Sequence, residues 1–159
     1  MSRDATFEEG RETPLYLAAL DLEDLQVLSA LSQDAVFPIT EMRWQARARR
    51  FALLLNRFRW EDLPAAERHK RTPERVQTLL VIDNVLKVSS QGIDRSDKDL
   101  ILSLLAVTFT PGEDGMGEVL LTLAGDGALR LEVEALEVTL KDVTRPYVAP
   151  SRKVPKHPE

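Results

Sequence analysis

The stretch "AVTFTPGEDGMGEVLLTLAGDGALRLEVE", residues 106–134, decides the fold class. It contains three short apolar segments, and two glycine-rich breaks, "PGEDGMG" and "GDG", separate them. Apolar residues that alternate with polar ones are typical of half-buried strands, and breaks of this kind are typical of hairpin turns. The stretch therefore predicts a meander of antiparallel strands.

The residues before the meander predict further strands and one helix. "PLYLAAL" (14–20) reads as a short strand, and the leucines of residues 22–34 recur every three positions, which is typical of a helical face. Asp21 is the expected N-cap of this helix. In residues 42–60 the alternation of Met42 and Trp44 with charged residues predicts a hairpin, and the apolar run 76–90 predicts one long strand, perturbed near Asp83.

Two further segments favour short helices. Ser96 followed by Asp99 resembles a capping box, and leucines with helical spacing come next, so we expect a helix over residues 97–104. The apolar residues of the last strand occupy odd-numbered positions before Ala135 and even-numbered positions after it, which is compatible with a bulged strand or a helix. We favour a short helix over residues 136–143.

These elements predict a single α+β domain over residues 14–145, with a mostly antiparallel sheet of about seven strands. A pleckstrin-homology-like barrel is one arrangement that fits this inventory, by analogy of fold alone. We expect a flexible tail over residues 1–13 and an extended, proline-rich tail over residues 146–159. Tyr147 and Val148 offer an apolar anchor that would dock the first half of the second tail.

The composition excludes several classes of protein. The chain has 159 residues, a formal charge of −5 and no cysteine, which removes disulfides, thiolate nucleophiles and cysteine-based metal sites. No apolar segment has the length of a membrane helix or the pattern of a secretory signal. We therefore expect a soluble, cytoplasmic protein without membrane contact.

The sequence offers little to a catalytic or metal site. Its two histidines, His69 and His157, stand in charged or proline-rich surroundings without a recognisable carboxylate partner. A calcium loop that starts at Asp94 would place Lys98 among the ligands, where its charge would repel the ion. We assign no catalytic residue, metal ligand or cofactor, and an enzyme is less expected than a binding protein.

The hairpin 42–60 contains arginines and aromatic residues without any acidic residue. Such a surface suits phosphate contact and base stacking, so RNA binding is one hypothesis. We favour the alternative, in which the aromatic residues are core and the acidic last third pairs the arginines. The segment "SSQGIDRSDKD" (89–99) contributes two further candidates, Asp94 and Arg95. The full set of candidate binding residues is Arg43, Trp44, Arg47, Arg49, Arg50, Arg57, Arg59, Asp94 and Arg95.

Three segments, "RFALLLNRFRWED", "SSQGIDRSDKDLILSLLAVTF" and "LRLEVEALEVTLKDV", together with the terminal "KHPE", resemble a family of bacterial proteins of unknown function. The family is common in alpha-proteobacteria, and its members are about the size of this chain. The resemblance covers residues 14–159 and implies a bacterial protein without implying an activity. We expect a non-catalytic binding or assembly protein, for which a homodimer is one arrangement; RNA binding is the first alternative and an enzyme with an unrecognised site the second.

Overall fold

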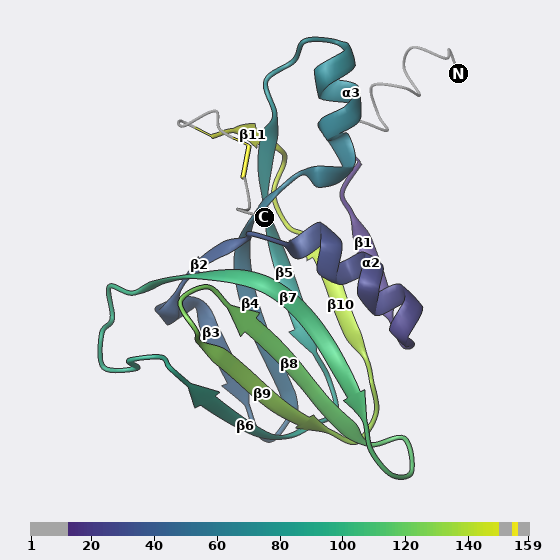
Figure 1. Cartoon of the computed structure of the whole chain (residues 1–159), viewed down its shortest axis with the longest axis vertical. Helices are drawn as coiled ribbons and strands as arrows, with labels where there is room; N and C mark the ends of the chain where they lie inside the picture. Colours follow the sequence, from purple (N-terminus) through teal and green to yellow (C-terminus); the bar gives the residue numbers. More distant parts are fainter. Residues whose placement is uncertain (1–12, 150–153, 156–159) are drawn as a thin grey trace.

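The computed structural model describes residues 13–149 and 154–155, so almost all of the expected N-terminal tail and most of the C-terminal one lie outside the described residues. The described chain forms one sheet of eleven strands with two α-helices (Figure 1). Every strand pairing in it is antiparallel. The predicted class of a mostly antiparallel sheet with helices is thus confirmed.

The helical elements are α2 (Leu22–Ser32), η1 (Ile39–Glu41), η2 (Trp60–Asp62) and α3 (Leu63–Arg68). The strands are β1 (Tyr16–Ala19), β2 (Val36–Pro38), β3 (Met42–Gln45), β4 (Arg50–Phe58), β5 (Glu74–Ile82), β6 (Val85–Gln91), β7 (Ile101–Pro111), β8 (Gly117–Leu123), β9 (Ala128–Val133), β10 (Val138–Asp142) and β11 (Tyr147–Val148).

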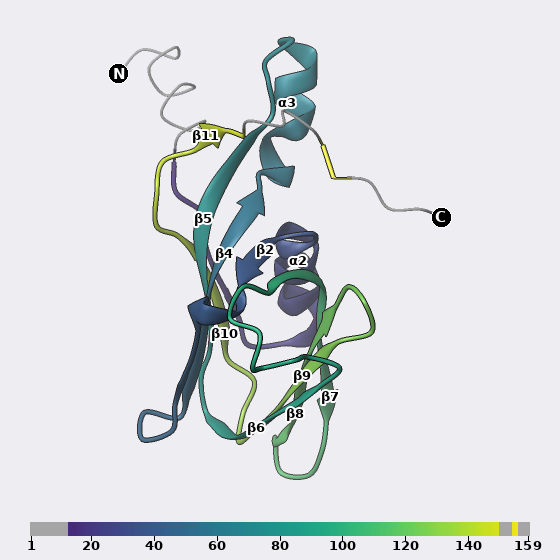
Figure 2. The same cartoon turned by 90° about the vertical axis from the view of Figure 1, so that its left-hand side faces the viewer.

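The sheet consists of two halves that the short strand β2 joins. One half has the order β1-β10-β5-β4 and the other β7-β8-β9-β6, while β2 pairs with both β4 and β7. Strand β3 extends the first half beyond β4. In the side view the two halves curl toward each other (Figure 2), and the sheet stays open because β3 and β6 do not pair.

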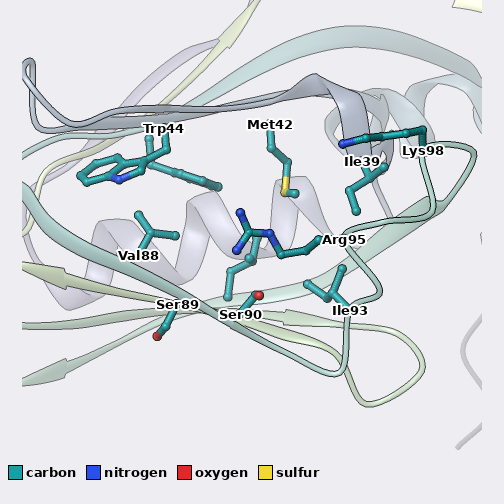
Figure 3. A pocket seen from close by; sticks show the side chains of 11 residues that line it. Ile39, Met42, Trp44, Val88, Ser89, Ser90, Ile93, Arg95 and Lys98 are labelled. Carbon is teal, nitrogen blue, oxygen red and sulfur yellow. The ribbon is translucent and has the colours of Figure 1, made fainter.

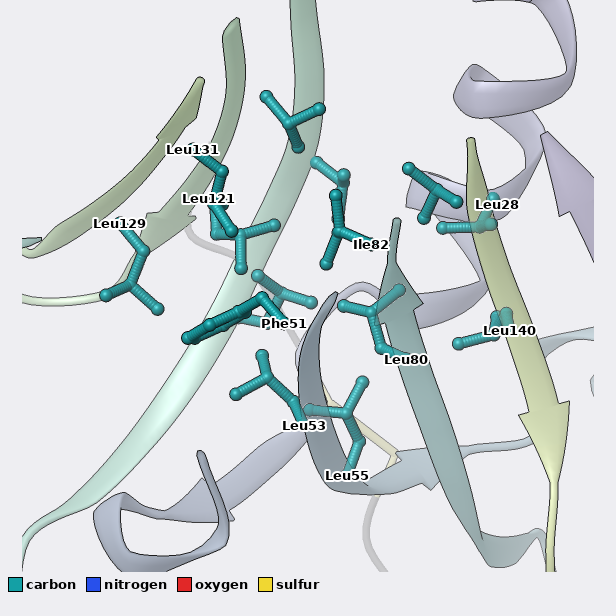
Figure 4. Packing of buried hydrophobic residues seen from close by; sticks show 14 of the residues in the cluster. Leu28, Phe51, Leu53, Leu55, Leu80, Ile82, Leu121, Leu129, Leu131 and Leu140 are labelled. Carbon is teal, nitrogen blue, oxygen red and sulfur yellow. The ribbon is translucent and has the colours of Figure 1, made fainter. Parts of the chain in front are cut away.

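The core fills the space between the two halves. Leu121, Leu129 and Leu131 from β8 and β9 point toward Phe51 and Leu53 on β4, and all five are buried (Figure 4). The period-two pattern of each strand supplies these side chains, since alternate residues face the same side. Helix α2 packs against β7 and covers one end of this core.

The predicted helix over residues 22–34 is confirmed as α2. The Asp21 carboxylate accepts a hydrogen bond from the Asp24 backbone amide at 2.8 Å, as an N-cap does. Leu25 and Leu28 form its buried face. Strand β1, the β3–β4 hairpin and the β7–β8–β9 meander lie where the sequence predicts them.

The predicted helix over residues 97–104 is wrong. Residues 92–100 form a loop and β7 begins at Ile101. Strand β7 buries Leu102 and Leu104 and then Val107, because a bulge between Leu104 and Ala106 shifts its register. This shift breaks the period-two pattern and leaves buried residues three positions apart, at Leu104 and Val107, as on a helical face.

The predicted helix over residues 136–143 is also wrong, because β10 occupies residues 138–142. The parity change after Ala135 marks the place where the chain leaves β9 in one half of the sheet and enters β10 in the other. The long strand expected over residues 76–90 is likewise two strands, β5 and β6, which turn at Asn84 with a φ of 61°. Strands β6 and β10, together with the short strands β2 and β11, raise the number from the expected seven to eleven, in an open sheet rather than a barrel.

The chain beyond β10 returns to the sheet. Tyr147 and Val148 pair with Arg75 and Glu74 on β5, and the Tyr147 hydroxyl accepts a hydrogen bond of 2.6 Å from the Asn56 side chain.

Among the described residues, no helix is both long and apolar enough to cross a membrane.

Candidate functional site

The structure separates the candidate arginines of residues 42–60 into buried and exposed groups. Arg57 is fully buried at the end of β4, where its guanidinium contacts the Glu61 carboxylate at 2.7 Å and the Asp142 carboxylate at 3.0 Å. The Thr78 hydroxyl donates to the same Asp142 carboxylate at 2.7 Å. Burial acts to lower the pKa of Arg57, but its hydrogen bonds and charge attraction to the two carboxylates outweigh this effect and raise the pKa. Arg57 therefore remains protonated, and the carboxylates of Glu61 and Asp142 already balance its charge.

Arg59 belongs to a second buried group, in the segment that we call the α3 arm (residues 57–75). Its guanidinium lies 2.9 Å from the Glu74 carboxylate and 3.5 Å from the Asp62 carboxylate. Arg71 contacts both oxygens of the Asp62 carboxylate, at 3.0 and 3.2 Å. These contacts hold α3 against the ends of β4 and β5.

The other four hairpin arginines are exposed. Arg49 pairs with Glu134 at 2.7 Å, and Arg50 pairs with Asp83 at 2.8 Å. Arg43 donates to the backbone carbonyl groups of Thr40 and Met42, and Arg47 lies in the β3–β4 turn. The arginines of residues 42–60 thus do not form one continuous basic surface.

A cleft opens where the curled sheet fails to close. Strands β3 and β6 face each other across it, and each pairs with another strand on its far side only, as far as the described residues show. At one end the Val85 amide donates to the Arg49 carbonyl at 2.9 Å, and at the other the Ile39 amide donates to the Leu100 carbonyl at 2.9 Å. These two contacts and the loop 92–100 border the gap between the facing edges of β3 and β6. The hydrophobic core lies beneath this gap.

The cleft has a volume of about 310 Å³, and its lining combines apolar side chains with two serines and two cationic residues. Phe51 and Leu129 are buried residues of the core and form its floor, and Ile39 closes it near η1. Met42 and Trp44 line it from β3, because alternate residues of a strand share one face. The lining residues are Ile39, Met42, Trp44, Phe51, Val88, Ser89, Ser90, Ile93, Arg95, Lys98 and Leu129.

Two cations from the loop 92–100 complete the cleft. The Arg95 guanidinium reaches into the space between Met42 and Val88, and Lys98 extends across the cleft near Ile39 (Figure 3). Within residues 13–149 and 154–155, Arg95 and Lys98 form no ion pair with a carboxylate. Their charges are therefore available to a ligand.

The loop that carries these cations is held by its own short-range hydrogen bonds. The Asp94 carboxylate accepts hydrogen bonds from the Ser96 hydroxyl at 2.6 Å and the Ser96 amide at 3.0 Å, and these bonds lower the pKa of Asp94. Gly92 adopts a φ of 68°, and a Cβ at this position would lie 2.8 Å from the Asp126 carbonyl oxygen. Close approach to the β8–β9 turn thus requires glycine.

A second cavity, of about 380 Å³, lies beside β2 and β4 and includes Asn56, Gln77 and Ile101. Its Asn56 side chain already donates to Tyr147 and accepts from Arg75. Ligand sites generally combine apolar walls with polar groups that remain available. The cleft between β3 and β6 meets this condition better and is the candidate site.

Sequence reasoning identified Trp44 and Arg95 as candidates but did not place them together. It missed Met42, Val88 and Lys98, which come from three separate segments. Asp94 stands in the same loop without lining the cleft. One signal could have identified the loop: Gly92 followed by closely spaced Asp and Ser residues is typical of a turn-rich segment rather than a helix start.

The chain belongs to the family "Protein of unknown function (DUF2948)", which matches residues 15–157. The resemblance to a family of unknown function is therefore confirmed over nearly all of the chain. No curated protein and no solved structure matches it.

Proposed function

We propose that this protein is a non-catalytic binding protein and that its ligand is a small, largely apolar molecule held in the cleft between β3 and β6. The observation that carries the proposal is the gap in the sheet, where a cavity lined by seven apolar residues reaches the core residues Phe51 and Leu129. Two strand edges, a loop and two backbone hydrogen bonds enclose this gap.

The size of the cleft limits the ligand. Small-molecule sites commonly have volumes of about 300 to 1,000 Å³, so a cavity of about 310 Å³ accepts only a small molecule. Its floor is built from the hydrophobic core and needs little rearrangement. A site that is already formed binds without an added cost for ordering its walls.

The lining supports binding rather than catalysis. Among the described residues that line the cleft there is no histidine, aspartate or glutamate that could act as a general base for Ser89 or Ser90. His69 lies at the end of α3, outside this lining. The residues present can enclose, orient and neutralise a ligand.

The alternative of RNA binding has less support from the geometry. Arg57 and Arg59 are buried and paired, and Arg49 and Arg50 have carboxylate partners. Within the described part of the chain, Arg43 and Arg47 are the hairpin arginines that are exposed and have no carboxylate partner. Trp44, the aromatic residue that stacking would need, lines the cleft instead.

The test uses the neutral fluorophore N-phenyl-1-naphthylamine, because its binding does not depend on charge. We expect saturable binding of one molecule per chain, together with an increase in the melting temperature. Ser90→Phe should block binding by filling the cleft, whereas Thr108→Phe on the exposed face of β7 should leave it unchanged. No saturable binding, or equal binding by both variants, would contradict the proposal.

An assembly role has one observation in its favour. The edge strand β1 pairs on one side only in the described chain, and Tyr16, Leu20, Leu22 and Val27 expose large apolar side chains on or near it. A homodimer would cover them. Light scattering should then show a dimer that Leu20→Glu dissociates and Leu86→Glu, on β6, does not; a monomer at all concentrations would contradict this role.

A further inference from the structure

The charged groups that line the cleft all have the same sign. Arg95 and Lys98 are its only charged lining residues among those that the structure describes, and both come from the loop 92–100. That loop also contains Asp94, Asp97 and Asp99, none of which lines the cleft. The chain therefore presents the cations of a mixed-charge loop to the cavity and keeps the acidic residues outside it.

The acidic residues of the loop have separate roles. Asp94 accepts two hydrogen bonds from Ser96, and the Asp97 carboxylate accepts one from the Asp99 amide at 3.0 Å. These bonds shape the turns of the loop. Among the described residues, neither Asp94 nor Asp97 forms an ion pair with Arg95 or Lys98.

The two ends of the cleft differ in chemistry. Trp44 lies at one end and Lys98 at the other, with the Arg95 guanidinium between them (Figure 3). Phe51 and Leu129 provide the apolar floor, and Ser90 adds a hydroxyl group to the lining. A ligand that satisfies both parts needs an apolar body and a compact anionic group at one end.

We infer that the ligand of this cleft is an anionic amphiphile, whose apolar body packs on Trp44, Phe51 and Leu129 while its carboxylate or phosphate group contacts Arg95 and Lys98. This inference rests on the proposed function of the cleft as a ligand site. Guanidinium groups bind carboxylate and phosphate through paired hydrogen bonds, and an ammonium group adds a point charge. Apolar burial supplies affinity, and the two cations supply selectivity for the head group.

The experiment uses four probes with the same ten-carbon chain, each below its micelle concentration: decanoate, decyl phosphate, 1-decanol and decyltrimethylammonium. The protein carries Trp60→Phe, so that Trp44 is its single tryptophan reporter. Displacement of N-phenyl-1-naphthylamine measures the same binding independently. Decanoate or decyl phosphate should bind about tenfold more tightly than 1-decanol, and the tighter of the two identifies the head-group class.

Charge variants test the role assigned to the loop. Arg95→Gln with Lys98→Gln should reduce the affinity for the anionic probes to about that for 1-decanol, and should change 1-decanol binding much less. Lys87→Gln, on the exposed face of β6, is the matched control and should have no effect. Added salt should weaken decanoate binding more than 1-decanol binding, because ions screen exposed charges.

The outcomes separate this inference from the proposed function. Equal binding of 1-decanol and both anionic probes, or stronger binding of decyltrimethylammonium, would overturn the anionic head group and leave the apolar site in place. Unchanged anion binding by the double charge variant would overturn the role of Arg95 and Lys98. Failure of every probe, N-phenyl-1-naphthylamine included, would overturn the proposed function as well.

Discussion

The α3 arm and the cleft both contain cationic side chains, but they use them in opposite ways. In the arm, Arg57 and Arg59 are buried, and carboxylates lie within 3.0 Å of both guanidinium groups. In the cleft, Arg95 and Lys98 are exposed, and the described part of the chain gives them no carboxylate partner. The presence of an arginine in this sequence therefore does not indicate whether it stabilises the fold or is available to a ligand; that depends on its burial and its ion-pair partners.

The physical reason for the difference is desolvation. A buried guanidinium loses its hydration and is tolerated only when carboxylates replace the lost water. An exposed cation keeps its hydration and can exchange it for a ligand. The arm thus uses arginine to connect β4, η2 and β10, whereas the cleft keeps two cations available at its surface.

The strongest test of this comparison removes the central cation of the arm. Arg57→Ala should lower the free energy of unfolding by about 3–5 kcal/mol, because it leaves the buried Asp142 carboxylate without its main counter-charge. Urea denaturation measures the effect. Arg50→Ala removes an exposed pair and should cost about 1 kcal/mol or less. Equal costs for the two variants would show that burial does not distinguish these arginines.

The next test concerns the loop that carries the cleft cations. Gly92→Ala should destabilise the protein by about 2 kcal/mol or more, because it combines a positive φ with a contact to the Asp126 carbonyl. Gly125→Ala has a similar φ of 78° and no atom within 4 Å of the added Cβ, so it should cost only about 1–2 kcal/mol. Thermal or urea unfolding of both variants gives the comparison, and a larger cost for Gly125→Ala would be inconsistent with the packing of the loop.

The cations of the cleft should contribute almost nothing to stability. Arg95→Gln and Lys98→Gln remove exposed charges that form no ion pair with any described residue, so each should change the free energy of unfolding by no more than about 0.5 kcal/mol. Urea denaturation at neutral pH is the measurement. A loss of 2 kcal/mol or more from either variant would assign that cation a structural role like that of Arg57.

The smallest expected effect is a change in the titration of Asp94. Hydrogen bonds from Ser96 lower its pKa in the folded protein, so their contribution is present above the ordinary value of 3.8 and is lost as the pH falls through the folded pKa. Ser96→Ala removes the hydroxyl donor and keeps the backbone donor, so the pKa should rise part of the way toward its ordinary value. Carboxyl carbon shifts in an NMR titration report this change. Ser89→Ala is the control, and an equal rise in that variant would contradict the assignment.

The sequence by itself determined the features that depend on neighbouring residues. The alternation in residues 106–134 predicts β8, β9 and the second half of β7, and Asp21 predicts the start of α2, because strand faces and helix caps involve residues only a few positions apart. The hairpin of β3 and β4 was predictable for the same reason. The sequence also indicated that the acidic last third could pair the arginines, as it does for Arg49 and Arg57.

Only the tertiary structure decided the elements whose partners are distant. Residues 97–104 carry helical spacing, yet Ile101 and the residues after it join β7, because β2 and β8 offer backbone partners on both sides. Strand β10 forms because β1 and β5 flank it. In both places, pairing with distant strands outweighs a local preference that is worth less than 1 kcal/mol per residue.

The cleft is also a product of tertiary structure. Its lining comes from η1, β3, β4, β6, β9 and the loop 92–100, and the sequence places these segments up to about 90 residues apart. Trp44 and Arg95 were visible as candidates because their residue types suit binding, but nothing local indicated that they share a cavity. Their meeting depends on the curl of the sheet and on the gap between β3 and β6, which arise from strand order rather than from any single segment.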